Sequence, residues 1–344
     1  MPELRHDPIQ RQWVIIASER ARRPSEFEVT VTQQSAEFCP FCPCNEDKTP
    51  PEILAVRDGY SAPNSPGWSV RVVANKYPAL RIEGEVDRAA EGLYDRMNGI
   101  GAHEIVIETP DHTRHLADLP PAHLAKVLRT FRERLVDLMR DIRFLYVAVF
   151  RNYGESAGAT LSHPHSQLIA MPILPRVVEI ELHSARDHYH HRERCLFCDV
   201  IRQELDAGTR VVVDKGRFAA FAPYASRSPF ELFLAPVHHQ HDYCQISDAD
   251  TEILAETLVE TLHRLRSALN DPPFNLMMHI APNMKSRSIW LQDFPYLADA
   301  YHWHIEIIPR LTKSAGFEWG TGFHINPTPP ELAADYLRRI KFPE

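Results

Sequence analysis

The chain has 344 residues, which is enough for two domains of about 100–200 residues each and for a full core without disulfides. Its 38 Lys and Arg residues against 46 Asp and Glu residues give a net charge of −8, which argues against a nucleic-acid coat or a polybasic membrane binder. No stretch approaches the ~20 apolar residues of a membrane span, and the first residues lack a signal-peptide pattern, so we expect a cytoplasmic protein.

The predicted elements follow the same order in both halves of the chain. The first half contains a Cys-x-x-Cys pair, a strand over 68–74, an apolar segment running from 104 to His112, an amphipathic helix over 121–139, a strand over 144–150 and a His-x-His segment at 163–165. The second half contains a Cys-x-x-Cys pair, an apolar segment running from 231 to His239, a helix over 248–265, a strand over 274–279 and a His-x-His strand over 302–309. The charged stretch 184–194 between them is interpreted as a solvated linker.

This repeated order predicts an α+β protein with an internal duplication. We expect two tandem α+β domains, residues 1–180 and 181–344, each with an antiparallel half-barrel sheet flanked by helices. The alternative is that two unrelated αβ domains share the order by chance, but the cysteine and histidine types recur together with the elements.

Four of the six cysteines form the two Cys-x-x-Cys pairs. One such pair is also compatible with a thioredoxin-like redox site. Two pairs, each accompanied by histidines, instead predict two tetrahedral zinc sites, because zinc prefers four sulfur and nitrogen ligands. The expected ligands are Cys39, Cys42, His112 and His163 in the first site and Cys195, Cys198, His239 and His302 in the second. The competing histidines are His103, His115, His238 and His241.

The segment that ends at Gln167 differs from the rest of the chain, because it combines glycines with the sequence His-Pro-His-Ser-Gln. Gly154 and Gly158 let backbone approach a ligand closely, and successive N–H groups can cradle an anion. Alternate strand residues share a face, so His163, His165 and Gln167 would lie together. A neutral imidazole attacks phosphorus well, so we predict that His165 is the nucleophile and that Gln167 stabilises the developing charge. The alternative is that His165 is a spare metal ligand.

The second half carries a similar segment, His302-Trp-His304-Ile-Glu306, in which a glutamate takes the place of the glutamine. A carboxylate would repel a phosphate oxygen, and no glycine-rich loop precedes this segment. We therefore expect the second half to be structural and His304 not to be catalytic.

The segment from Asn152 to Gln167 resembles the active-site motif of galactose-1-phosphate uridylyltransferases, in the histidine-triad superfamily. The resemblance covers most of the chain: residues 12–24 and 71–80 are similar to the family's first strand and nucleotide-side strand, and Pro110-Asp-His112 matches a zinc-ligand segment. The intact second Cys/His set is more similar to the two-zinc branch, which includes ADP-glucose phosphorylase, so uracil and adenine both stay open. Lys76 stands where better-studied bacterial members have an acidic residue, so the resemblance does not imply the ribose contacts at that position.

The resemblance implies two histidine-triad-like domains and a homodimer without nucleic-acid or membrane partners. It implies a ping-pong reaction in which a uridylyl group passes from UDP-glucose to galactose 1-phosphate through a covalent nucleotidyl group on His165. Adenylyl transfer between a sugar 1-phosphate and phosphate, or hydrolysis as in histidine-triad nucleotide hydrolases, are the alternatives. Both zinc sites would be structural, with iron as an alternative metal in the second. The implied substrate contacts are Arg20, Arg23, Asn75, Asn152, Gly158, Thr160, Lys313 and Phe317.

Overall fold

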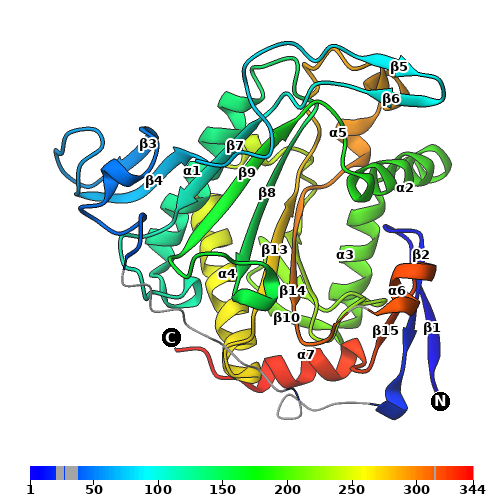
Figure 1. Cartoon of the computed structure of the whole chain (residues 1–344). Coiled ribbons are helices and arrows are strands. Elements are labelled where there is room, and N and C mark those ends of the chain that lie inside the picture. The colour runs from blue at the N-terminus through cyan, green and yellow to red at the C-terminus, as the bar shows by residue number, and fades with distance from the viewer. Residues whose placement is uncertain (21–26, 28–37, 314, 344) are drawn as a thin grey trace.

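The computed structural model describes residues 1–20, 27, 38–313 and 315–343. Its centre is one ten-stranded antiparallel sheet (Figure 1). From one edge to the other, the strands are β10 (Val211–Asp214), β11 (Phe218–Phe221), β12 (Leu232–Pro236), β14 (His304–Pro309), β13 (Phe274–His279), β8 (Tyr146–Tyr153), β9 (His165–Met171), β7 (Ala102–Ile107), β4 (Trp68–Ala74) and β3 (Glu52–Arg57). Two small sheets accompany it, formed by β1 (Glu3–Asp7), β2 (Gln12–Ile16) and β15 (His324–Asn326), and by β5 (Ala89–Glu91) and β6 (Tyr94–Arg96).

The two halves of the large sheet have the same topology. The orders β3-β4-β7-β9-β8 and β10-β11-β12-β14-β13 correspond strand by strand, and a long helix follows the third strand of each set. The halves join where β8 pairs with β13, in a register that places Phe274 opposite Tyr153. The sequence predicted a separate half-barrel for each domain. The structure instead has one continuous sheet, because β8 and β13, the last strands of these two orders, pair with each other. The duplication itself and the boundary at residue 180 stay predictions.

Two long helices cover one face of the sheet. They are α1 (Pro121–Leu138) and α4 (Asp248–Leu269), which pack against each other and against strands of both halves. Helix α1 begins with proline at its first position, where a missing N–H costs nothing. The Ser247 hydroxyl caps α4 by accepting from the N–H of Asp250, and Asn270 ends it in a left-handed conformation with φ 55°. Both helices therefore form close to where the sequence predicts them.

The opposite face is covered unevenly. Helices α2 (Arg176–Arg192) and α3 (Leu196–Ala207) lie beside the strands of the second half, and Phe197 of α3 packs on the ring of His304. Strands β8 and β9 face the viewer of Figure 1 without a helix in front of them. The linker predicted over 184–194 is wrong, because most of it belongs to α2, where His188 Nε2 lies 2.9 Å from Asp199 Oδ2.

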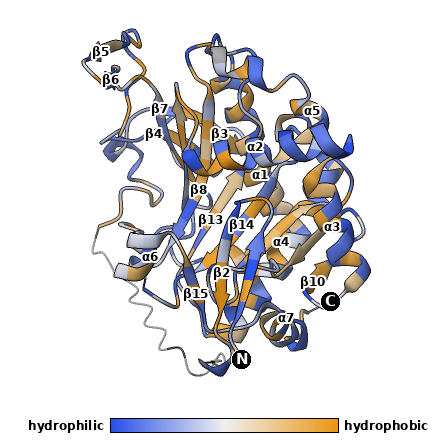
Figure 2. Cartoon of the chain, turned by 90° about the vertical axis from the view of Figure 1, so that its right-hand side faces the viewer, coloured by the Kyte–Doolittle hydropathy of each residue, from blue (hydrophilic) through white to orange (hydrophobic). Residues whose placement is uncertain are grey.

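Three short helices complete the fold: α5 (Leu297–Ala300), α6 (Gly316–Thr321) and α7 (Pro330–Arg339). The apolar core lies between the sheet and the helices, and the hydrophobic colouring of Figure 2 follows the central strands. Within the described ranges, no helix is both long and apolar enough to cross a bilayer.

Candidate active site

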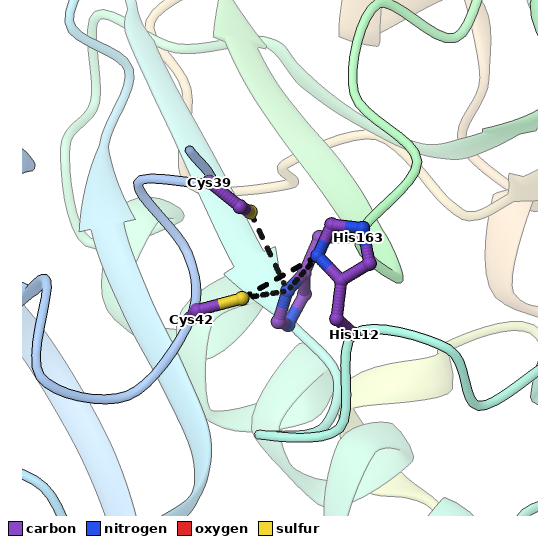
Figure 3. Close-up of side chains that lie close together, drawn as sticks. All are labelled: Cys39, Cys42, His112 and His163. Carbon is purple, nitrogen blue, oxygen red and sulfur yellow. Dashed lines mark hydrogen bonds between the residues drawn. The ribbon is translucent and has the colours of Figure 1, made fainter. Parts of the chain in front are cut away.

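Four predicted metal ligands lie together beside the start of β9 (Figure 3). His163 Nδ1 lies 3.6 Å from the Sγ atoms of both Cys39 and Cys42 and 3.3 Å from His112 Nδ1, which is 3.4 Å from Cys42 Sγ. A tetrahedral zinc ion, bonded at about 2.3 Å to sulfur and about 2.05 Å to nitrogen, would separate its ligands by about 3.6 Å for S–N pairs and about 3.3 Å for N–N pairs. The group therefore has the dimensions of a Cys₂His₂ zinc site.

Backbone contacts prepare the His163 ring as a ligand. Its Nε2–H donates to the carbonyl of Thr109 at 2.8 Å, so the lone pair is on Nδ1, the atom that faces the cysteines. Burial lowers the pKa of His163 to about 4, which keeps the ring neutral near pH 7. His112 is also placed by its far nitrogen, since His112 Nε2 lies 3.1 Å from Ser162 Oγ.

A second Cys₂His₂ group lies at the start of α3. Cys198 Sγ is 3.4 Å from His239 Nδ1 and 3.5 Å from His302 Nδ1, and Cys195 completes the group. Both rings donate Nε2–H to backbone carbonyls, His239 at 2.8 Å and His302 at 3.1 Å. The hydrogen bond from Cys195, followed by those from the two histidines, lowers the pKa of Cys198 to about 3 despite burial. This favours the thiolate that a metal requires.

The four competing histidines do not join these groups among the described residues. His115 Nδ1 instead accepts from the N–H of Ala117 at 2.9 Å and caps the short helix η4 (Leu116–Asp118). His103 lies beside Gln167 on the sheet. His238 is exposed, whereas His241 is half-buried.

A third group was missed by the sequence analysis. Glu181, His279, His304 and Glu306 are all buried, and their ligand atoms lie within 4.8 Å of one another. Although burial alone disfavours the imidazolium, Glu181, whose carboxylate is 2.7 Å away, and Glu306 raise the pKa of His279 to about 9. These side chains could hold a metal ion, but the Arg227 guanidinium lies 2.7 Å from Glu306 Oε2 and competes for that carboxylate. This group was missed because Glu181 and His279 lie far apart in the sequence and neither belongs to a short motif.

The ring of His165, the predicted nucleophile, is oriented by the start of β9. Its Nδ1–H donates to the carbonyl of His163 at 2.8 Å, so the lone pair is on Nε2. Burial lowers the pKa of His165 below its ordinary value, although that hydrogen bond and Glu108 favour the charged form. The ring is only 7% exposed and lines a cavity of about 240 Å³. A neutral imidazole with a free Nε2 thus faces a space that a ligand can enter.

A glycine-containing loop forms the wall of this cavity. Gly154 and Gly158 have φ values of 82° and 89° and flank the short helix η5 (Glu155–Ala157). A Cβ on Gly154 would lie 2.7 Å from Pro273, so only glycine fits there. Asn275 Nδ2 donates to Asn152 Oδ1 at 2.8 Å and also to the carbonyl of Ala157 at 2.8 Å. This orients Asn152 with its own N–H groups free for a ligand. Nothing in the local sequence indicated Asn275.

Three arginines line the cavity, and each is paired with a carboxylate. They are Arg114, Arg151 and Arg266, and Glu155 is the one carboxylate among the described lining residues. Arg114 lies 3.6 Å from Asp111, and Arg266 lies 3.1 Å from Asp271. Arg151 is itself held by Glu108, whose carboxylate oxygens both lie 3.1 Å from Arg151 Nε.

The structure gathers only part of the expected substrate set. Asn152 and Thr160 line the cavity with His165, and Gly158 adjoins them. Gln167 and Asn75 lie further along the same face, both beside His103. The exposed Lys313 and Phe317 lie near α6 and are not among the described lining residues. Arg20 ends the short helix η1 (Ser18–Arg20), but its side chain and all of Arg23 fall outside the described part of the chain.

Comparisons with known proteins agree with this geometry. The family model described as galactose-1-phosphate uridyl transferase, N-terminal domain, matches residues 1–175. The ADP-glucose phosphorylase of Arabidopsis thaliana is 33% identical over 98% of this chain and 93% of its own length. The galactose-1-phosphate uridylyltransferase of Thermotoga maritima is 27% identical over 99% of each chain. The crystal structure of an ADP-glucose phosphorylase from A. thaliana with bound ADP-glucose matches with a TM-score of 0.81 at 30% identity, covering 100% of both chains. The chain therefore belongs to the galactose-1-phosphate uridyl transferase family.

Proposed function

We propose that this protein is a hexose-1-phosphate nucleotidyltransferase that works through a covalent nucleotidyl group on His165. The observation that carries the proposal is the free Nε2 of a neutral, buried imidazole at the edge of a cavity that is lined by three arginines and a glycine-containing loop. Family membership supports it, because the relatives are named as a phosphorylase and uridylyltransferases that act on sugar phosphates.

In the first step, His165 Nε2 forms a bond to the α-phosphorus of a nucleoside diphosphate sugar. The bond from that phosphorus to the bridging oxygen breaks, and the sugar 1-phosphate leaves with the electron pair. The ring becomes positively charged while it keeps its Nδ1 proton, and the carbonyl of His163 stabilises that charge. In the second step, an acceptor phosphate oxygen attacks the phosphorus and Nε2 is released.

The neighbouring side chains stabilise the phosphoryl group. The free N–H groups of Asn152, the loop at Gly158 and the Thr160 hydroxyl surround its oxygens, and the Gln167 amide donates as charge develops. We keep Arg20, Arg23, Asn75, Lys313 and Phe317 as proposed contacts to nucleotide and sugar. In a homodimer, Lys313 and Phe317 would complete the site of the partner subunit.

The two Cys₂His₂ groups would hold structural metal ions, with zinc as the proposed metal and iron as an alternative in the second group. Each group offers four protein ligands, which fills a tetrahedral site and leaves no position for substrate. The first metal would fix His163, two residues before the nucleophile, and so hold the start of β9.

For the substrates, we propose uridylyl transfer from UDP-glucose to galactose 1-phosphate. A second candidate is adenylyl transfer between ADP-glucose and phosphate. It is favoured by the 33% identity to ADP-glucose phosphorylase and by the complete second Cys₂His₂ group.

The test is intact-mass measurement after incubation with UDP-glucose or ADP-glucose separately. A gain of about 306 Da indicates a uridylyl group and a gain of about 329 Da an adenylyl group on a nucleophilic side chain. The adduct should discharge onto galactose 1-phosphate in the first case and onto phosphate in the second. His165→Gly should fold but form neither adduct. Rapid release of free nucleoside monophosphate without an acceptor would indicate hydrolysis, and normal transfer by His165→Gly would refute the proposal.

A further inference from the structure

His103 and Gln167 share a face of the sheet with the nucleophile. Strands β7 and β9 are antiparallel, with His103 opposite Ile169, Ile105 opposite Gln167 and Ile107 opposite His165. Opposed residues of a pair point to the same side, so the imidazole of His103 lies diagonally across from the Gln167 amide. His103 Nε2 is 2.8 Å from Gln167 Oε1.

The tautomer of His103 follows from its other contacts. The backbone N–H of Ala79 can only donate, and it lies 3.2 Å from His103 Nδ1, so Nδ1 carries the lone pair. The backbone N–H of Tyr77 donates to Asn75 Oδ1 at 2.9 Å, which turns Asn75 Nδ2 toward the same ring, 3.1 Å from Nε2 and 3.4 Å from Nδ1, so Asn75 does not distinguish the two ring nitrogens. The Ala79 contact places the ring proton on Nε2, from which it is donated to Gln167 Oε1.

This contact decides which way the Gln167 amide points. An amide has nearly the same shape after a 180° rotation, so packing alone distinguishes its two orientations poorly. With Oε1 bound to His103, the Nε2 hydrogens are left to point elsewhere along the face that carries His165. In the reverse orientation, the carbonyl oxygen would be presented to the anionic phosphoryl group and would repel it.

We propose that His103 is a positioning residue, which rests on the function proposed above: its Nε2–H fixes the amide of Gln167 so that the amide N–H groups stabilise the phosphoryl group on His165. In this chain of hydrogen bonds, the Ala79 N–H donates to His103 Nδ1, His103 Nε2–H donates to Gln167 Oε1, and the Gln167 amide N–H donates to the reacting phosphate. His103 itself need not touch the substrate.

The second half of the chain offers an internal comparison. There Glu306 takes the place of Gln167 and pairs across the strands with Phe233, as Gln167 pairs with Ile105. The residue two positions before Phe233 is Glu231, which corresponds to His103. Arg227 bridges these two carboxylates, with distances of 2.6 Å to Glu231 and 2.7 Å to Glu306. In the second half, where His304 is buried, these two positions carry carboxylates that pair with Arg227. In the first half, which carries His165, they hold an imidazole and an amide that are hydrogen-bonded to each other.

The experiment compares His103→Leu, His103→Gln, Gln167→Ala and the double variant His103→Leu/Gln167→Ala. The single-turnover rate of adduct formation on His165 and the KM of the nucleotide sugar are measured for each. His190→Leu, an exposed histidine on α2, is the matched control and should leave both unchanged. Thermal melts confirm that every variant is folded.

We expect His103→Leu to lower the rate by about 10- to 100-fold, the range for loss of an oriented donor, with KM changed less than about 3-fold. His103→Gln, whose amide N–H can reach the position of Nε2, should recover most of that rate. In the Gln167→Ala background, the further loss from His103→Leu should be less than about 2-fold, because the two residues act as one unit. Additive losses in the double variant would overturn the proposal while leaving the covalent mechanism intact. If the wild-type protein forms no adduct, the proposed function fails, and this inference fails with it.

Discussion

The ion pair between Arg151 and Glu108 gives a sharp test of how the site is supported. The Arg151 side chain is 3% exposed and that of Glu108 is 1% exposed. Glu108 also accepts from Ser166 Oγ at 2.5 Å, and its backbone N–H donates to the carbonyl of Pro164 at 3.1 Å. Through Glu108, the pair therefore contacts Pro164 and Ser166, the two residues on either side of His165.

The perturbation is Arg151→Met, which keeps the length of the side chain and removes its charge. It leaves the Glu108 carboxylate buried with one remaining side-chain donor. Breaking one partner of a buried pair costs about 3–5 kcal/mol in the free energy of unfolding. With an unfolding entropy of about 2.1 cal/mol/K per residue, a chain of 344 residues has about 0.7 kcal/mol/K, so Tm should fall by about 4–7 °C.

The assay is thermal unfolding followed by circular dichroism, with urea unfolding to obtain the free energy. The control is the double variant Arg151→Met/Glu108→Gln, which removes the stranded charge and keeps an acceptor for Ser166. It should regain more than half of the lost stability. A Tm for Arg151→Met within 1 °C of the wild type, or a double variant less stable than the single one, would refute the reasoning.

Three further predictions concern other parts of the molecule. Burial raises the pKa of Asp7 to about 6, so the folded state binds more protons than the unfolded state and loses stability as pH rises from about 4 to 6. Asp7→Asn should therefore be more stable than the wild type by about 2–3 kcal/mol at pH 7.5 and equal to it at pH 3.5 in urea titrations; a constant difference would contradict this. Asn275→Leu strands Asn152 Oδ1 and the Ala157 carbonyl, so we expect the rate of adduct formation to fall about 10-fold and stability by about 1–3 kcal/mol; an unchanged rate would show that Asn152 needs no support. Metal analysis should find about two zinc ions per chain, and removing them with a chelator should lower Tm and abolish the adduct until zinc is restored, whereas full activity of metal-free protein would exclude the structural role.

The local elements could be predicted from the sequence because their causes are local. The helix over 121–139 follows apolar spacing and an initial proline, and the strand over 274–279 has the predicted bounds. The first Cys₂His₂ group was predicted because Cys-x-x-Cys is a compact motif and because His112 and His163 lie in recognisable segments. Periodicity and short motifs carry this information without reference to the rest of the chain.

The contacts that were missed depend on how distant strands assemble. Asn275 reaches Asn152 only because β8 and β13 pair across the centre of the sheet, and nothing within either strand indicates that register. His103 was considered as a metal ligand because its residue type allows it. Its place diagonally across from Gln167, two residue pairs along the strands, follows from the β7–β9 pairing. Residues 184–194 were misread because their charges suggested a solvated linker, although a helix can carry charges on its exposed side.

The two halves place a histidine ring in the same strand geometry but cover it differently. In both halves a histidine donates Nδ1–H to the carbonyl two residues earlier, His165 at 2.8 Å and His304 at 3.2 Å. His304 is fully buried, stacked on Phe233 at 4.4 Å between ring centroids and packed against Phe197 of α3. The equivalent ring of His165 borders a cavity that Gly154 and Glu155 also line, and no α-helix lies in front of β8 and β9 in Figure 1. We therefore expect the covering of the sheet face to decide which of the two histidines can react. Large side chains introduced into the cavity beside His165 should prevent adduct formation on His165, even if the hydrogen bonds of its ring are intact.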